Sequence, residues 1–266
     1  MMNLIELQNI KFSYKGNKNG NFTLGKLNLS INKGEIVSVF GPNGSGKSTL
    51  LKIISGSVLP DEGQVFLNNK DLREYSHKSL AKQIGFVPTL SSSVYPFSVY
   101  EVVMSGRTPY LGFAGFEKKE DHEIVIDALK TVGIYHLRNK GINEVSGGEA
   151  QRAYIARALA QRTEIILLDE PTAHLDLKHQ VAVFNLLQKL NSEQGITILI
   201  VSHDLNLAGN FSSRAVLMKH GKIIKDGDVL DVLTEQNISS VFEVESKVTL
   251  DKHDNTENLN IQIKCY

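Results

Sequence analysis

A glycine-rich segment between an apolar run and a helical pattern constrains the fold of this chain more than any other feature. It reads Gly41-Pro-Asn-Gly-Ser-Gly-Lys-Ser48 and directly follows the apolar residues Ile36–Phe40. Glycines let backbone amides curl around phosphate oxygens without a Cβ in the way, and the N-terminus of a following helix adds partial positive charge. The spacing Gly-x-x-x-x-Gly-Lys-Ser therefore predicts a phosphate-binding loop rather than an ordinary turn.

The residues of this loop have separate expected roles toward a nucleotide. Lys47 is expected to reach the β- and γ-phosphates and to act in catalysis, and the Ser48 hydroxyl to bind Mg²⁺. The residues predicted to contact the nucleotide phosphates are Gly41, Pro42, Asn43, Gly44, Ser45, Gly46, Lys47, Ser48 and Thr49.

A second apolar run, at residues 165–168, leads directly into two carboxylates, Asp169 and Glu170. The carboxyl ends of parallel strands form the ligand-binding edge of open α/β sheets. Asp169 is therefore predicted to hold Mg²⁺, directly or through water, and Glu170 to polarise the attacking water as a general base. For this segment taken alone, the alternative is a solvated acidic turn that Pro171 ends.

Hydrophobic periodicity indicates an α/β fold. Residues 4–40 alternate apolar and polar side chains in several runs, a pattern typical of half-buried antiparallel strands. Continuous apolar runs predict a buried parallel sheet; they lie at residues 36–40, 84–87, 165–168 and 196–201. The predicted fold class is α/β, a P-loop NTPase core with a parallel sheet, an N-terminal antiparallel β subdomain and an inserted helical subdomain at about 89–160. Residues 1–235 are expected to form this ATPase domain and 236–266 a C-terminal extension without a clear pattern.

Composition limits the classes of partner. Lys plus Arg and Asp plus Glu both total 29, so no net field favours nucleic acid or an anionic membrane. The one cysteine, Cys265, excludes a disulfide within the chain and favours a reducing, cytoplasmic location. The sequence carries no signal-peptide pattern, and no window approaches the ~18–20 apolar residues of a membrane-spanning helix. A membrane role is therefore expected only through a partner.

Residues 146–149, Ser-Gly-Gly-Glu, open a second helical pattern. Ser-x-x-Glu is a helix capping box, which is the purely structural interpretation. Two successive glycines in a first turn, however, cost roughly 1 kcal/mol each relative to alanine. An exposed helix N-terminus that accepts a phosphate would require residues without a side chain here, because the phosphate must approach the backbone amides.

The segment Val145-Ser-Gly-Gly-Glu-Ala-Gln-Arg152 resembles the signature of ABC-type ATPases, whose usual form is Leu-Ser-Gly-Gly-Gln. Other motifs of the family follow in order over residues 5–235. Tyr14 resembles the aromatic residue that stacks on adenine, the stretch at 171–176 the segment with the D-loop, and His203 the switch histidine. The remaining histidines, His174 and His179 among them, are interpreted as ordinary surface or helix residues.

The resemblance implies a head-to-tail dimer with ATP held between the phosphate loop of one subunit and the signature of the other. His203 would contact the γ-phosphate within its own subunit and help to hold the water and Glu170. The residues that the resemblance adds to the nucleotide site are Tyr14, Ser146, Gly147, Gly148, Glu149 and Asp176.

Three further segments resemble the ATPase subunits of importers for iron-siderophore, haem and cobalamin, with molybdate-type relatives. They are residues 96–109, 170–176 and 203–208. The implied partners are integral-membrane permease subunits on the cytoplasmic face, received around residues 89–110, and indirectly a substrate-binding protein. The alternatives are a soluble ABC ATPase acting on nucleic acid or ribosomes, or an importer for molybdate or another metal ion. The single phosphate loop, the short interval before the signature and the neutral charge disfavour nucleic acid as a partner.

One position departs from the family pattern. Where the family usually reads Val-Pro-Gln, this chain reads Val87-Pro88-Thr89. The usual glutamine reaches Mg²⁺ and the attacking water, whereas a threonine hydroxyl is shorter and is expected to reach the metal only through a water. ATP binding is then expected to survive while hydrolysis or its coupling is slowed. In the alternative, Ser91–Ser93 or solvent complete the metal shell.

Overall fold

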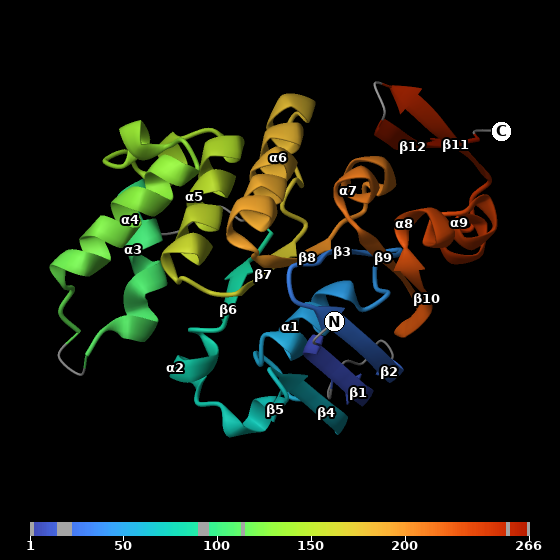
Figure 1. Cartoon of the computed structure of the whole chain (residues 1–266), viewed down its shortest axis with the longest axis horizontal. Coiled ribbons are helices and arrows are strands. Elements are labelled where there is room, and N and C mark those ends of the chain that lie inside the picture. Colours follow the sequence, from blue (N-terminus) through green and yellow to red (C-terminus); the bar gives the residue numbers. More distant parts are fainter. Residues whose placement is uncertain (1–2, 15–22, 90–95, 113–114, 254–255, 265–266) are drawn as a thin grey trace. The chain divides into compact units, whose positions relative to one another are not determined.

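The computed structural model describes residues 3–14, 23–89, 96–112, 115–253 and 256–264. The chain divides into two compact units, one of residues 1–74 and 197–266 and the other of residues 75–196. The α/β fold class is confirmed by strands and helices in both units (Figure 1). The predicted domain boundaries near residues 89, 160 and 235 stay predictions.

The antiparallel N-terminal strands predicted from the alternating pattern are present in the first unit. They form a sheet in the order β2-β1-β4-β5; its strands are β1 (Asn3–Ser13), β2 (Thr23–Asn32), β4 (Glu62–Leu67) and β5 (Lys70–Asp71). Apolar side chains alternate into the core along β2, where Leu24, Leu27 and Leu29 are buried. The pattern did not reveal β4 and β5.

A second sheet of the first unit holds the phosphate loop. Strand β3 (Ile36–Phe40) pairs in parallel with β8 (Thr197–Val201) on one side and β9 (Arg214–Lys219) on the other, and β10 (Lys222–Asp228) is antiparallel to β9. Every residue of β3 and β8 is buried. The continuous apolar runs thus form the buried parallel strands expected of them. Helix α1 (Lys47–Ile54) begins in the loop after β3 (Figure 1).

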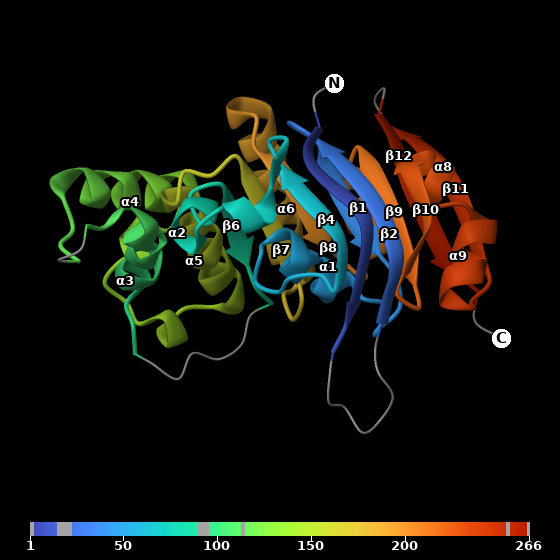
Figure 2. The same cartoon turned by 90° about the horizontal axis from the view of Figure 1, so that it is seen from below.

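The C-terminal part of the first unit is more ordered than its composition indicated. After the short helices α7 (Leu205–Phe211), α8 (Val229–Val232) and α9 (Glu235–Phe242), the chain forms an antiparallel hairpin of β11 (Ser246–His253) and β12 (Thr256–Ile263). Figure 2 shows this hairpin beside α9.

The second unit combines a short parallel pair with the inserted helices. Strands β6 (Ile84–Val87) and β7 (Ile165–Asp169) pair in parallel. The helices of this unit are α2 (His77–Leu80), α3 (Val99–Met104), α4 (Lys119–Thr131), α5 (Gly147–Ala160) and α6 (Leu177–Gln194), with 3₁₀ turns at Ser105–Tyr110, Tyr135–Leu137 and Ile142–Glu144. A buried ion pair joins the first of these turns to α4: Arg107 Nε lies 2.8 Å from Asp121 Oδ1. Arg107 Nη1 also donates to the carbonyl of Ala160, so α5 is fixed to the same point.

Among the helices within the described ranges, none combines the length and the hydropathy that a membrane crossing requires.

Candidate nucleotide-binding site

The phosphate loop follows β3 and lies tightly against β9. A Cβ atom on Gly41 would lie 2.2 Å from the backbone oxygen of Met218, so only glycine allows this approach. Gly44 and Gly46 have φ values of 77° and 105°, in the left-handed region that side chains disfavour. Gly46 is the N-cap of α1, so the backbone amides at the end of the loop lie at the start of that helix.

Lys47 lies inside the curve of the loop. Its ammonium donates hydrogen bonds to the carbonyl oxygens of Gly41 at 2.8 Å and Pro42 at 3.2 Å. The Ser45 hydroxyl is buried beside it and has no hydrogen-bond partner among the described residues. A buried polar atom normally has a partner, and a phosphate oxygen seated in the loop would supply one. The loop is thus suited to an anion of the size of a phosphate group.

His203 shares a sheet edge with the phosphate loop. Val39 of β3 is in register with Val201 of β8, and the amide of Ser202 donates to the Val39 carbonyl at 3.2 Å. Because the strands are parallel, the loop after β3 and His203 after β8 emerge at the same edge. His203 is exposed and immediately precedes Asp204, the N-cap of α7. The structure therefore brings these two predicted elements together.

Tyr14 lies at the end of β1 with part of its ring exposed. The ring packs edge-on against Phe12, with a centroid distance of 4.8 Å and an interplanar angle of 88°. Its side chain is 36 % exposed, which leaves ring surface for another aromatic group. A role in stacking on adenine stays a prediction.

Asp169 and Glu170 lie where the sequence placed them, at the carboxyl end of β7. Glu170 has a φ of 49°, a left-handed conformation that is uncommon for residues other than glycine. Its carbonyl accepts a hydrogen bond from the amide of Ala173 at 3.1 Å, so a tight turn holds this conformation. Backbone outliers of this kind cluster at functional sites.

Thr89 follows β6 and reaches the adjacent strand end. Its hydroxyl donates a hydrogen bond to the backbone carbonyl of Asp169 at 2.9 Å. The register explains this contact, because Val87 of β6 pairs with Leu168 of β7. The threonine hydroxyl is thus engaged with the backbone beside the predicted metal ligand. Ser91–Ser93, which were considered as substitutes in the metal shell, lie outside the described residues.

Replacing Thr89 with glutamine is expected to raise kcat severalfold at saturating Mg-ATP. The glutamine side chain is longer than that of threonine and ends in an amide oxygen. That oxygen can reach Mg²⁺ as a ligand beside Asp169. Steady-state hydrolysis of the natural protein and of Thr89→Gln measures the difference. Thr89→Val is the control, because it removes the hydroxyl bond without adding a ligand and should not raise kcat. Equal rates for the natural protein and Thr89→Gln would contradict the expectation.

Ser146 caps helix α5 in a reciprocal capping box. Its side chain accepts from the amide of Glu149, and Glu149 Oε2 accepts from the Ser146 amide at 2.8 Å. The Ser146 amide and the Ser146 hydroxyl both donate to the Glu149 carboxylate and hold its pKa below the usual value. The structural interpretation of the Ser-x-x-Glu pattern is therefore confirmed. Ser146 and Gly147 are nevertheless exposed, so the start of α5 is open to an external group.

The two glycines of this segment have different reasons to be glycine. A Cβ on Gly148 would lie 2.4 Å from Cδ2 of His179 on α6, whereas one on Gly147 would meet only Leu175 Cδ2, at 3.3 Å. Packing therefore requires glycine more strictly at 148 than at 147, where the Leu175 side chain would have to shift by only a few tenths of an ångström. His179 in turn contacts Asp176, the N-cap of α6, with Nδ1 2.8 Å from Oδ1. The sequence interpretation missed this role of His179, and no pattern around it could have revealed it.

The predicted site residues thus fall into two sets. The first unit carries the phosphate loop, Tyr14 and His203, and the second carries Thr89, Asp169, Glu170, Asp176 and residues 146–149. Within the described ranges, no three His, Cys, Asp or Glu side chains gather as a metal site. Mg²⁺ is usually bound by one or two protein oxygens together with substrate phosphates. The Ser48 hydroxyl and the Asp169 carboxylate are hard oxygen donors of that kind.

The sequence profile described as ABC transporter matches residues 24–173. The iron(3+)-hydroxamate import ATP-binding protein FhuC of Bacillus subtilis (strain 168) is 42 % identical over 229 residues, covering 86 % of this chain and 85 % of the relative. The hemin import ATP-binding protein HmuV of Escherichia coli O157:H7 is 37 % identical over 254 residues, covering 93 % and 95 %.

Solved structures show the same likeness. A metal-chelate type ABC transporter in an inward-facing conformation superposes with a TM-score of 0.87 at 30 % identity, covering 99 % of this chain and 98 % of that one. A dimeric ATP-binding cassette bound to ADP and phosphate gives a TM-score of 0.73 at 35 % identity, covering 85 % and 98 %. Along the chain, the phosphate loop comes first, the signature segment at 145–152 follows, and Asp169 and Glu170 come after it. The chain therefore belongs to the ABC transporter family, as an ATP-binding ATPase.

Proposed function

We propose that this chain energises a membrane importer of a metal chelate, such as an iron-siderophore complex or haem. The observation that carries the proposal is the likeness to a metal-chelate type transporter over 99 % of the chain, which includes the C-terminal hairpin. FhuC and HmuV, which are named for iron-hydroxamate and hemin import, support the same class of cargo. In this proposal the transport path belongs to a separate permease.

In this proposal the loop amides and the Lys47 ammonium bind the β- and γ-phosphates of ATP. The buried Ser45 hydroxyl and the glycine-lined curve of the loop support this role. Ser48 and Asp169 would hold Mg²⁺, which would neutralise charge on the phosphates. Glu170 orients the attacking water and accepts its proton, and His203 contacts the γ-phosphate.

Two copies of the chain close around two ATP molecules. The signature of one copy, at the exposed start of α5, meets the γ-phosphate held by the other copy's loop. Gly147 supports this arrangement, because it is exposed at the first position of α5, where a phosphate group can approach the helix start. Binding of ATP closes the pair, and hydrolysis releases it.

The proposed location is peripheral, on the cytoplasmic face of the membrane. The permease would dock around residues 89–110. Within the described part of this segment, Phe97 leaves 49 % of its surface exposed next to α3. Large exposed aromatic side chains are typical anchors of protein interfaces.

Co-purification with the permease tests this function. We expect the chain to co-purify with a polytopic permease encoded by a neighbouring gene, and Phe97→Asp to abolish that association without loss of ATP binding. Phe116→Asp is the matched control, because Phe116 is 80 % exposed but lies outside the docking segment. Equal loss of co-purification in both variants, or co-purification retained in both, would contradict the proposed docking surface. Failure of the natural chain to associate would contradict the importer role.

A further inference from the structure

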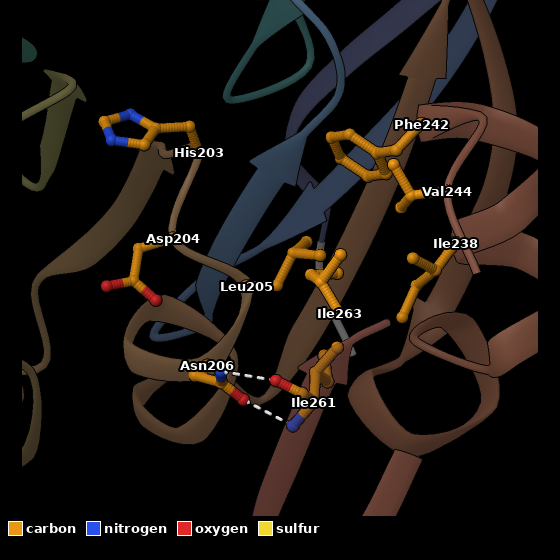
Figure 3. A pocket seen from close by; sticks show the side chains of 9 residues that line it. All are labelled: His203, Asp204, Leu205, Asn206, Ile238, Phe242, Val244, Ile261 and Ile263. Carbon is orange, nitrogen blue, oxygen red and sulfur yellow. Dashed lines mark hydrogen bonds between the residues drawn. The ribbon is translucent and has the colours of Figure 1, made fainter. Parts of the chain in front are cut away.

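Two asparagines on α7 bind the backbone of the C-terminal hairpin. Asn206 Nδ2 donates to the carbonyl of Ile261 at 2.9 Å, and Asn206 Oδ1 accepts from the Ile261 amide at 2.6 Å (Figure 3). Asn210 makes the same pair of bonds with Leu259, at 2.8 and 2.7 Å. Each side-chain amide thus offers one donor and one acceptor to a single strand residue, as a neighbouring strand would.

The spacing of the two asparagines matches that of the strand. Residues four apart on an α-helix are separated by about 6 Å along the axis, and residues two apart on a strand by about 6.6 Å. Asn206 and Asn210 can therefore serve Ile261 and Leu259 at the same time. One edge of β12 pairs with β11, and these four hydrogen bonds satisfy groups of β12 that β11 does not use.

Side chains of other elements pack closely on α7 around Gly209. A Cβ on Gly209 would lie 3.4 Å from Leu259 Cδ2, so the helix lies close to the strand there. Toward the start of α7 a pocket of about 400 Å³ opens instead, lined by residues of the 203–206 segment, α9, Val244 and β12 (Figure 3). Beside this pocket, the two hydrogen bonds of Asn206 join the first turn of α7 to β12.

This attachment lies three residues from His203. Asp204 caps α7 by accepting from the amide of Leu207 at 2.8 Å, and its own amide donates to the Ser202 hydroxyl at 3.1 Å. A shift of the first turn of α7 is therefore transmitted to His203 through this short, hydrogen-bonded segment.

We propose that the C-terminal hairpin is a positioning element for ATP hydrolysis. Asn206 and Asn210 are positioning residues: they fix α7 to β12 and thereby set the orientation of His203. The inference rests on the proposed contact of His203 with the γ-phosphate. The proposal thus gives a positioning role in hydrolysis to the C-terminal hairpin, a segment in which the sequence showed no clear pattern.

The test compares Asn206→Ala, Asn210→Ala and the double variant in the full chain. We expect the double variant to lower kcat roughly tenfold, a part of the ~10²–10³-fold that loss of one hydrogen-bond donor to the transition state costs. KM for Mg-ATP should stay unchanged, because the phosphate loop is untouched. Asn260→Ala is the matched control: it lies on β12 between the two bonded residues, and its side chain bonds Asp251 within the hairpin at 3.0 Å. It should keep the natural kcat.

The same substitutions in a His203→Ala background separate positioning from a structural effect. If the asparagines act through His203, they cause no further loss of kcat in that background. An equal, additive loss there, or a natural kcat in the double variant, would overturn the proposal. Unchanged hydrolysis in His203→Ala alone would instead contradict the role of His203. If the double variant does not fold, Asn206→Asp decides, because it is nearly isosteric and replaces the donor to the Ile261 carbonyl with a charged carboxylate oxygen that cannot donate; an unchanged kcat in that variant overturns the proposal.

Discussion

Replacing Glu170 with glutamine is expected to lower ATP turnover by at least about 10²-fold, the lower bound for loss of a positioned general base. Glutamine has the same shape as glutamate but cannot take a proton from the attacking water. ATP affinity should be retained, because the phosphate loop and Lys47 belong to the other unit of the chain. Single-turnover hydrolysis and equilibrium binding of a fluorescent ATP analogue measure the two quantities separately.

The control for this variant is Glu164→Gln. Glu164 is exposed and precedes the opposite end of the same strand, β7, so the chemical change is identical while the position is not. Its turnover should equal that of the natural protein. A Glu170→Gln variant that hydrolyses ATP at the natural rate would show that another group acts as the base.

A negative charge at Gly147 is expected to abolish hydrolysis without destabilising the chain. In the dimer, an Asp carboxylate about 4 Å from a phosphate charge would cost roughly 4 kcal/mol at an effective dielectric constant of about 20. This corresponds to about a thousandfold in the closing equilibrium. At the first position of α5, however, an acidic residue interacts favourably with the helix dipole, so the melting temperature should not fall. Steady-state ATPase assays and thermal unfolding of Gly147→Asp measure both effects.

Gly147→Asn is the matched control for charge. Asparagine has nearly the same volume as aspartate, so both side chains meet the same close neighbour, Leu175 Cδ2, at 3.3 Å from the added Cβ. The neutral variant should therefore lose much less activity than Gly147→Asp. Equal activity of Gly147→Asp and the natural protein would mean that no phosphate approaches this helix start.

The parts of the site formed by consecutive residues could be predicted from the sequence. Residues 41–48 carry their own strand, loop and helix start, and Asp169 and Glu170 follow directly from the apolar run before them. Each of these predictions depends on local backbone geometry and burial alone, which the order of residues determines. That is why the phosphate loop and the acidic strand end were placed correctly.

Contacts between distant segments could not be predicted in this way. The bond from Thr89 to the carbonyl of Asp169 exists because β6 and β7 are neighbours in register. The packing of His179 on Gly148 likewise depends on how α6 lies against α5. The sequence identified both Thr89 and Gly148 as unusual positions, but only the structure supplies their partners.

The C-terminal hairpin shows the same limit. Leu259 and Ile261 alternate with polar residues along β12, a weak strand pattern in a polar segment. The hydrogen bonds that hold the strand come from Asn206 and Asn210, far earlier in the chain. Hydrogen bonds from such distant residues leave no local pattern in the sequence, so the hairpin was not predicted.

The mass of Glu170→Gln in solution tests the central claim, that two chains close around ATP. With saturating ATP the variant should have twice the 29.5 kDa mass of one chain, and without nucleotide the mass of one chain. Adding Gly147→Asp should restore the single-chain mass while ATP still binds. A mass of one chain at saturating ATP, or a dimer that Gly147→Asp leaves intact, would contradict the account.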